Sequence, residues 1–277
     1  MQFRTVVDIP VPGFSIEPLE PMLFVGSCFA DSIGRRFQEE RFPVTVNPFG
    51  VMYNPASILH TIERWTSSPP QPSSPAPKTV FLTLGTNHVY RLKETGEIVD
   101  NCEKRPQRLF QEEQLTIDQC TACLTRAVDL LTEHNASVQV VVTVSPIRYA
   151  KYGFHGSQLS KAVLLLAADA LARQHSCVTY FPAYEIVLDE LRDYRFYQPD
   201  MLHTSQQAVE YIWQQLVEVF FSKRAKQFLH EWQPVKQALG HRPFHPDSDE
   251  YRQFIALTRQ KEADLLARYS TPSASTS

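Results

Sequence analysis

A cysteine directly after a short apolar segment is the first residue that could carry chemistry. Ser27 and Cys28 follow the apolar run 22–26, and a helical pattern covers roughly 29–40. A thiol at a strand-to-helix turn lies near exposed helix amides and the positive end of the helix dipole, which lower its pKa and favour the thiolate. Cys28 is therefore a candidate nucleophile, although a small buried cysteine at a strand–helix junction would give the same pattern.

A carboxylate and an imidazole three residues apart form the second candidate. Asp200 and His203 stand just ahead of a helical pattern at 204–222. At this spacing Asp200 can orient the His203 ring and stabilise its cation, so that His203 can act as a general base toward a nucleophile. A helix-capping aspartate followed by a polar surface histidine would leave the same sequence.

Further candidates are single residues or an isolated pair. Gly50 and Asn87 could donate to an oxyanion, because glycine allows close approach of a backbone N–H and asparagine adds an amide donor; both are also common turn residues. Arg148 could clamp a carboxylate or phosphate, or form a surface ion pair. Cys120-x-x-Cys123 resembles half of a zinc site without a second half. We therefore expect no metal and no cofactor.

Short apolar runs that alternate with helix-like stretches must position these residues. Runs that are hydrophobic on both faces favour a parallel sheet covered by helices, and their alternation with helices predicts a doubly wound α/β domain. Ligands bind such sheets at the carboxyl ends of the strands, where the candidates stand. Strands are expected at 22–26, 43–47, 79–85, 138–145 and 177–181, and helices at roughly 29–40, 56–66, 115–134, 159–175, 204–222 and 248–269.

Composition narrows the function classes. The chain has 277 residues, is 43% hydrophobic and carries a net charge of −3, so no basic bias points to nucleic acid. No apolar run approaches the roughly 18 residues of a membrane span, and the first residues do not form a signal peptide. The odd number of five cysteines favours a reducing compartment. We therefore expect a cytoplasmic protein, while its oligomeric state stays open.

The chain divides by composition into three parts. We expect an α/β domain over 1–245, interrupted by a proline-rich surface loop at 66–78. A helical extension follows at 246–268, and residues 269–277 read as a disordered tail.

The run Gly26-Ser27-Cys28-Phe29-Ala30 resembles the signature of the GSCFA-domain proteins, a largely bacterial family. The resemblance covers about residues 3 to 222. Its further blocks are 47–50 with 53–55, 83–86, 101–104, 143–148 with 160–161, and 180–203.

This family is in turn similar to the SGNH, or GDSL, hydrolase superfamily. That similarity implies a flavodoxin-like three-layer α/β/α sandwich with a central parallel sheet of about five strands. It also implies a triad of Cys28, His203 and Asp200. The implied oxyanion hole consists of the Cys28 N–H, the Gly50 N–H and Asn87.

The resemblance predicts an acyl-transfer enzyme, either an esterase or deacylase or an acyltransferase, acting on an O-acylated saccharide or cell-envelope precursor. Because Cys28 replaces a serine, a thioester intermediate would favour transfer as much as hydrolysis. Ser27 becomes the nucleophile if the register moves by one residue, and Asn47 and Arg148 are further binding candidates. The alternative is an inactive domain of the same fold that binds a small carbohydrate or nucleotide-like ligand. A thiol redox role would need a resolving cysteine near Cys28.

Overall fold

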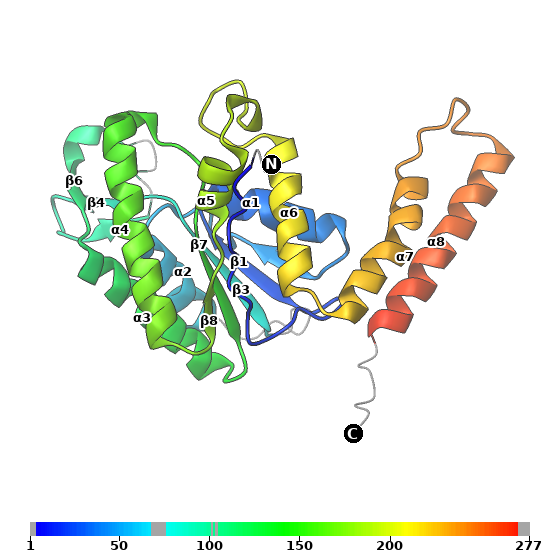
Figure 1. Cartoon of the computed structure of the whole chain (residues 1–277), viewed down its shortest axis with the longest axis horizontal. Helices are drawn as coiled ribbons and strands as arrows, with labels where there is room; N and C mark the ends of the chain where they lie inside the picture. Colours follow the sequence, from blue (N-terminus) through cyan, green and yellow to red (C-terminus); the bar gives the residue numbers. More distant parts are fainter. Residues whose placement is uncertain (1–3, 68–75, 101, 103–104, 271–277) are drawn as a thin grey trace.

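A five-stranded parallel sheet forms the centre of the molecule (Figure 1). The computed structural model describes residues 4–67, 76–100, 102 and 105–270. The strand order is β2-β1-β3-β7-β8. All five expected strands are present, and the predicted α/β class is confirmed. The strands are β1 (Met22–Gly26), β2 (Val44–Val46), β3 (Thr79–Leu84), β7 (Gln139–Val144) and β8 (Val178–Tyr180).

Helices cover both faces of this sheet, which gives the expected three layers. Alternate residues of each strand point to opposite faces. Phe24 and Phe81 face one cluster with α1 (Cys28–Glu39) and α6 (Gln206–Phe220). Adjacent residues of the same strands, such as Leu23 and Leu82, face a second cluster on the other side of the sheet. The helices of that cluster are α2 (Pro55–Ser67), α3 (Ile117–His134) and α4 (Gly153–Gln174).

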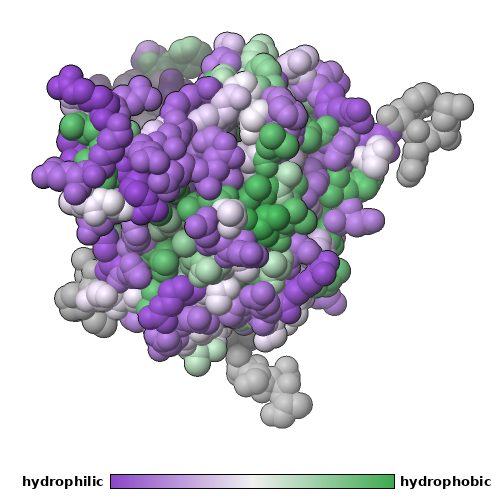
Figure 2. All heavy atoms as spheres, turned by 90° about the vertical axis from the view of Figure 1, so that its left-hand side faces the viewer, coloured by the Kyte–Doolittle hydropathy of each residue, from purple (hydrophilic) through white to green (hydrophobic). Residues whose placement is uncertain are grey.

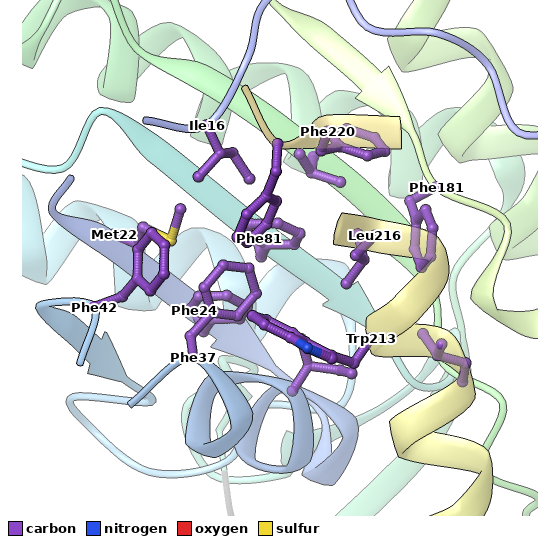
Figure 3. Close-up of a cluster of buried hydrophobic side chains, with 14 of the residues drawn as sticks. Ile16, Met22, Phe24, Phe37, Phe42, Phe81, Phe181, Trp213, Leu216 and Phe220 are labelled. Atoms are coloured by element: carbon purple, nitrogen blue, oxygen red, sulfur yellow. The ribbon is translucent and has the colours of Figure 1, made fainter. Parts of the chain in front are cut away.

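An aromatic cluster fastens α1 and α6 to the sheet (Figure 3). Phe24 and Phe81 are paired in register across β1 and β3, and their rings stack at 4.4 Å. Phe37 of α1 meets Trp213 of α6 edge to face at 4.7 Å. Both helices are thereby held on the face of the sheet, and each begins next to a candidate site residue.

A second, antiparallel sheet was not predicted. It contains β4 (His88–Leu92), β5 (Ile98–Val99) and β6 (Phe110–Gln114) in the order β5-β4-β6. It lies between β3 and α3 in the chain. Its strands are partly exposed and rich in polar residues, so they lack the continuous apolar runs that identified the central strands.

Two long helices follow the sandwich and pack against each other (Figure 1). The sequence predicted α8 (Asp249–Ser270) almost at its observed bounds, but not α7 (Lys223–Leu239). The helix α8 continues through Tyr269, which is buried, so the tail predicted from 269 starts too early; residues 271–277 lie outside the described part. Of the predicted loop 66–78, residues 66 and 67 are helical, and 68–75 lie outside the described residues.

The face of the molecule in Figure 2 is mostly polar. Figure 2 shows a face on which hydrophilic side chains surround smaller hydrophobic areas. The helix α4 carries the exposed apolar side chains of Phe154, Leu159 and Leu166. No helix in the described ranges has the length and apolar character needed to cross a bilayer.

Candidate active site

The carboxyl ends of the parallel strands bring the candidate segments to one edge of the sheet. The Asn47 N–H, after β2, donates to the Phe24 carbonyl of β1 at 2.8 Å. The Ser145 N–H, after β7, donates to the Leu84 carbonyl of β3 at 2.8 Å. Backbone hydrogen bonds thus tie the segment after β2 to β1 and the segment after β7 to β3.

Ser27 is a buried structural residue. Its side chain is inaccessible, accepts from the Phe29 N–H at 3.2 Å as the N-cap of α1, and lies 3.2 Å from Thr83 Oγ. Gly26 before it has a φ of 142°, and a Cβ there would lie 2.2 Å from the Thr83 carbonyl oxygen. The glycine thus permits the tight β1–α1 turn in which Ser27 turns inward.

Cys28 is the first residue of α1 and is half-buried. Its Sγ lies 3.6 Å from the Tyr53 hydroxyl, within hydrogen-bond range for sulfur. Its backbone N–H belongs to the first turn of the helix, where no preceding helical carbonyl can accept it. The thiol therefore has access to solvent, one side-chain partner and the positive end of the helix dipole.

Tyr53 is a site residue that the sequence analysis did not single out for chemistry. Its carbonyl accepts from the N–H groups of Gly85 at 2.9 Å and Thr86 at 2.8 Å, which fixes its backbone against the end of β3. Partial burial and the bond to Cys28 raise the pKa of Tyr53 to about 12. At neutral pH the hydroxyl keeps its proton and can donate a hydrogen bond to a thiolate.

Asp200 and His203 form the pair that their spacing suggested. His203 Nδ1 lies 2.6 Å from Asp200 Oδ2, while Asp200 Oδ1 accepts from the N–H groups of Leu202 at 2.9 Å and His203 at 3.0 Å. The Leu202 N–H and the two bonds from His203 lower the pKa of Asp200 to about 2. A carboxylate bonded to Nδ1 holds the neutral ring in the tautomer whose Nε2 accepts a proton.

The loop 200–203, called the histidine loop below, lies beside the segment that follows β7. The Arg148 N–H donates to the Leu202 carbonyl and its Nη1 to the Met201 carbonyl, both at 3.0 Å. A groove of about 510 Å³ also has Ser32 of α1 and Thr204 among its lining residues. One turn of helix separates Ser32 from Cys28, and its hydroxyl donates to the Cys28 carbonyl.

The structure does not join the thiol to the imidazole. Among the described residues no hydrogen bond links Cys28 to His203. The thiol is hydrogen-bonded to Tyr53, and the imidazole is hydrogen-bonded to Asp200. Catalytic hydrogen bonds are often long or unformed until substrate is bound. The two halves of the expected triad are thus placed at one edge of the sheet without direct contact.

The Gly50 N–H and the Asn47 side chain are both engaged in hydrogen bonds within the protein. The Gly50 N–H donates to the Asn47 carbonyl at 2.9 Å, and Gly50 has a φ of 98°. Asn47 Oδ1 accepts from the Gly26 N–H at 2.9 Å, and its Nδ2 donates to Asp31 at 2.7 Å. Both expected donors therefore serve the protein itself, and Asn47 ties the β2 turn to the β1–α1 turn.

Asn87 is likewise turned toward the protein. It is 2% exposed, and its Nδ2 donates to the Leu115 carbonyl at 2.8 Å. Its backbone N–H donates to Ser160 at 3.0 Å. In this conformation Asn87 holds the antiparallel sheet against α4 and is no free oxyanion donor.

A fully buried lysine lies beneath the same edge of the sheet. Lys161 Nζ donates to the carbonyls of Gly85 and Ser145, both at 2.7 Å, which bridges the ends of β3 and β7. Burial lowers the pKa of Lys161 to about 7. The sequence signal was a lone lysine directly before the apolar run 162–168; in the sequence, Lys161 stood out only as part of the family resemblance.

The CxxC pair belongs to the core. Cys120 is buried in α3, and burial raises its pKa to about 12. Within the described ranges no three His, Cys, Asp or Glu side chains are grouped as metal ligands would be. All five cysteines are free thiols.

Two family models match the sequence of this chain. The model of the GSCFA family matches residues 21–74 and 75–216, and that of the GSCFA domain protein C-terminal domain matches 232–273. No curated protein matches the chain.

Solved structures resemble the chain at low sequence identity. A lipolytic protein of the G-D-S-L family from Veillonella parvula is 14% identical, with a TM-score of 0.48 over 73% of this chain and 98% of that one. A catalytic mutant of an acetylxylan esterase from Geobacillus stearothermophilus is 13% identical (TM-score 0.47; 76% and 98% covered). A carbohydrate esterase of family 3 from Talaromyces cellulolyticus is 11% identical (TM-score 0.44; 76% and 98% covered). Since the family model matches most of the chain, from β1 past His203, this protein belongs to the GSCFA family.

Proposed function

We propose that this protein is an acyl-transfer enzyme, an esterase or acyltransferase, with Cys28 as its nucleophile. The observation that carries the proposal is the oriented Asp200–His203 pair, 2.6 Å apart, at the same edge of the sheet as a half-exposed thiol. An imidazole held by a carboxylate beside a nucleophile is the arrangement that activates thiols and hydroxyls for acyl transfer.

The reaction would proceed in two steps. In the first, His203 Nε2 takes the proton of the Cys28 thiol, and the thiolate attacks the carbonyl carbon of an ester. The C–O bond then breaks, the leaving alcohol takes the proton from His203, and a thioester remains on Cys28. In the second step, water or an acceptor alcohol gives its proton to His203 and attacks the thioester, which releases an acid or a new ester and restores the thiol.

The start of α1 would stabilise the charge that develops in each step. The Cys28 N–H, in the first turn of α1, and the positive end of the helix dipole would stabilise the negative charge on the carbonyl oxygen of the tetrahedral intermediate. The Tyr53 hydroxyl, 3.6 Å from Sγ, would donate to the thiolate. Gly50, Asn47 and Asn87 would act through the turns they hold, because their N–H groups or amides are bonded within the protein.

Cys28 is preferred to Ser27 because of their surroundings. The Ser27 hydroxyl is inaccessible and engaged in capping α1, so attack by it would require the β1–α1 turn to open. The sulfur of Cys28 needs no such change.

The substrate we propose is a small O-acylated saccharide or cell-envelope precursor. The net charge of −3 supports a partner other than nucleic acid, and the five free thiols support a reducing, cytoplasmic location. A protein of this fold that binds its ligand without reaction would share the cleft, and the experiment below separates the two.

The test is hydrolysis of an aryl acetate and of a short-chain acyl thioester by the full chain and its variants. Cys28→Ala and His203→Ala should each lower kcat/KM by about 10³-fold or more. Cys177→Ala is the matched control, since Cys177 is also half-buried but lies before β8, and it should leave kcat/KM unchanged. Equal activity in Cys28→Ala and the unmodified chain would refute the nucleophile, and no turnover of any donor would favour the binding domain.

A further inference from the structure

A pocket of about 270 Å³ adjoins the histidine loop and has no role in the acyl-transfer steps above. Its volume is just below the roughly 300 Å³ at which most small-molecule sites begin, which suits about one sugar ring. Arg148 joins the pocket to the loop through its bonds to the carbonyls of Met201 and Leu202. The polar and aromatic lining residues are Arg148, Gln158, Arg192, Asp193, Tyr194 and Tyr197.

Arg148 brings a half-buried positive charge to the pocket. Its guanidinium lies 4.0 Å from the centre of the Phe154 ring and 5.4 Å from that of Tyr197. Its Nη1 is bonded to a backbone carbonyl, and within the described residues no aspartate or glutamate forms an ion pair with it. The remaining N–H groups of the fork can bind an anion in bidentate geometry.

A second arginine enters the same pocket from an irregular segment. Arg192 ends the π-helix 186–191 and has a left-handed backbone with φ 46°. A non-glycine residue in this region is energetically unfavourable, and π-helical turns recur at functional sites. Among the described residues that line the pocket, the one acid is Asp193, which accepts from the Arg195 N–H at 2.9 Å and lies 3.5 Å from the Arg195 Nε. The pocket therefore carries an excess of positive charge.

Aromatic side chains give the pocket a second character. Tyr194 and Tyr197 both line the pocket; Tyr194 is 68% exposed, and Tyr197 is half-buried. Flat rings with a polar tip offer an apolar face and a hydrogen-bonding edge to the same ligand. A ligand that combines an apolar ring face, hydroxyl groups and a negative charge matches all three features.

We propose that this pocket binds an anionic sugar, a pyranose that carries a carboxylate or a phosphate, as the non-reacting part of the substrate. This rests on the proposed acyl-transfer function for its biological meaning, but the binding itself does not depend on catalysis. Arg148 and Arg192 would hold the anion, and Tyr194 would stack against the ring. Because Arg148 is bonded to the histidine loop, binding here would place an O-acyl group of the same molecule near His203.

The test is a binding measurement by calorimetry on the full chain carrying Cys28→Ala, which cannot turn over substrate. The probes are methyl β-glucuronide, glucose 6-phosphate and methyl β-glucoside, which share the ring and differ in the anion. We expect at least one anionic probe to bind about tenfold or more tightly than the glucoside. Arg148→Gln and, independently, the surface variant Arg192→Gln should each weaken that binding about tenfold, whereas Arg126→Gln, at an exposed arginine of α3 outside the pocket, should not.

The two anionic probes decide which group the arginines select. Equal affinity for the glucoside, unchanged affinity in both arginine variants, or no saturable binding of any probe up to about 10 mM would overturn the proposal. If no probe binds but the unmodified chain still forms an acyl group on Cys28, the sugar site is refuted and the proposed enzyme is not. If a probe binds but the unmodified chain forms no acyl group on Cys28, the proposed enzyme is refuted and the sugar site is not. A circular dichroism melt of Arg148→Gln shows whether that variant is folded, and Arg192→Gln gives the answer if it is not.

Discussion

The hydroxyl of Ser27 points into the protein, where it caps α1 and lies 3.2 Å from Thr83 Oγ, while the next side chain, Cys28, opens toward solvent. Replacing Ser27 by alanine should therefore act on stability rather than on chemistry. Loss of an N-cap costs about 1 kcal/mol, and the free energy of unfolding of Ser27→Ala should fall by that amount in urea. Its acylation by an aryl acetate should continue on Cys28; a folded variant that no longer forms the adduct would contradict this.

Lys161 should make stability depend on pH. Its folded pKa is about 7 and its ordinary value 10.5, so the unfolded chain binds more protons between these values. The free energy of unfolding should then rise from about pH 7 toward pH 10, by up to about 1.4 kcal/mol per pH unit from this group. The penalty for burying the charge is fully present below pH 7.

The control for Lys161 is the variant Lys161→Met, which keeps the length of the side chain without the charge. Urea unfolding of both proteins at about pH 6.5, 7.5 and 8.5 gives the difference in slope that belongs to Lys161. Parallel profiles for the two proteins would show that the lysine titrates at the same pH in the folded and unfolded states.

Single residues were predictable where their environment is local. The spacing of Asp200 and His203 pointed to their pair, because three residues of loop bring the two side chains together. The sequence could not decide whether Ser27 or Cys28 is the nucleophile, because the burial of the Ser27 hydroxyl depends on its contact with Thr83, which is 56 residues away. Lys161 was missed for the same reason: it contacts Gly85, 76 residues away.

At the scale of the elements, the largest side chain that α7 places against the end of α1 is that of Trp232. Trp232 is 1% exposed, its Nε1 donates to the Glu39 carbonyl at 3.3 Å, and the Arg41 guanidinium lies 5.2 Å from its ring. Trp232→Ala should lower the free energy of unfolding by about 3–5 kcal/mol through the cavity it leaves.

Phe244→Ala provides the control for Trp232→Ala. Phe244 is fully exposed in the connection between α7 and α8, so its removal should change the free energy of unfolding by less than about 0.5 kcal/mol. Urea denaturation followed by far-ultraviolet circular dichroism measures both variants. Similar values for the two would mean that the helix pair contributes little to the fold.

Elements were predictable where burial leaves a periodic pattern. The inner strands β1, β3 and β7 are buried on both faces and are rich in apolar residues, such as the three valines at 140–142. The helix α7 had a readable pattern, with Ala225, Phe228, Leu229 and Trp232 at helical spacing, but Pro234 inside it is typical of a helix end. The antiparallel sheet carries charges on exposed strands, and its pairing depends on contacts across the chain rather than on local pattern.

At the scale of the whole molecule, the sheet explains why distant segments share one site. Parallel strands place their carboxyl ends at the same edge, so the turns after β1, β2, β3 and β7 meet although 119 residues separate Gly26 from Ser145. That convergence followed from the expected fold class. The orientation of each donor did not, because side-chain packing decides it, as the inward amides of Asn47 and Asn87 show.

The measurement that tests the central claim most directly is the mass of the tryptic peptide 5–35, which contains both Ser27 and Cys28, after exposure to an acyl donor. We predict a hydroxylamine-labile acyl group on Cys28 in the unmodified chain, at a rate lowered about 10³-fold in His203→Ala. An acyl group on Ser27, or an unmodified peptide with every aryl ester and acyl thioester offered, would contradict the account.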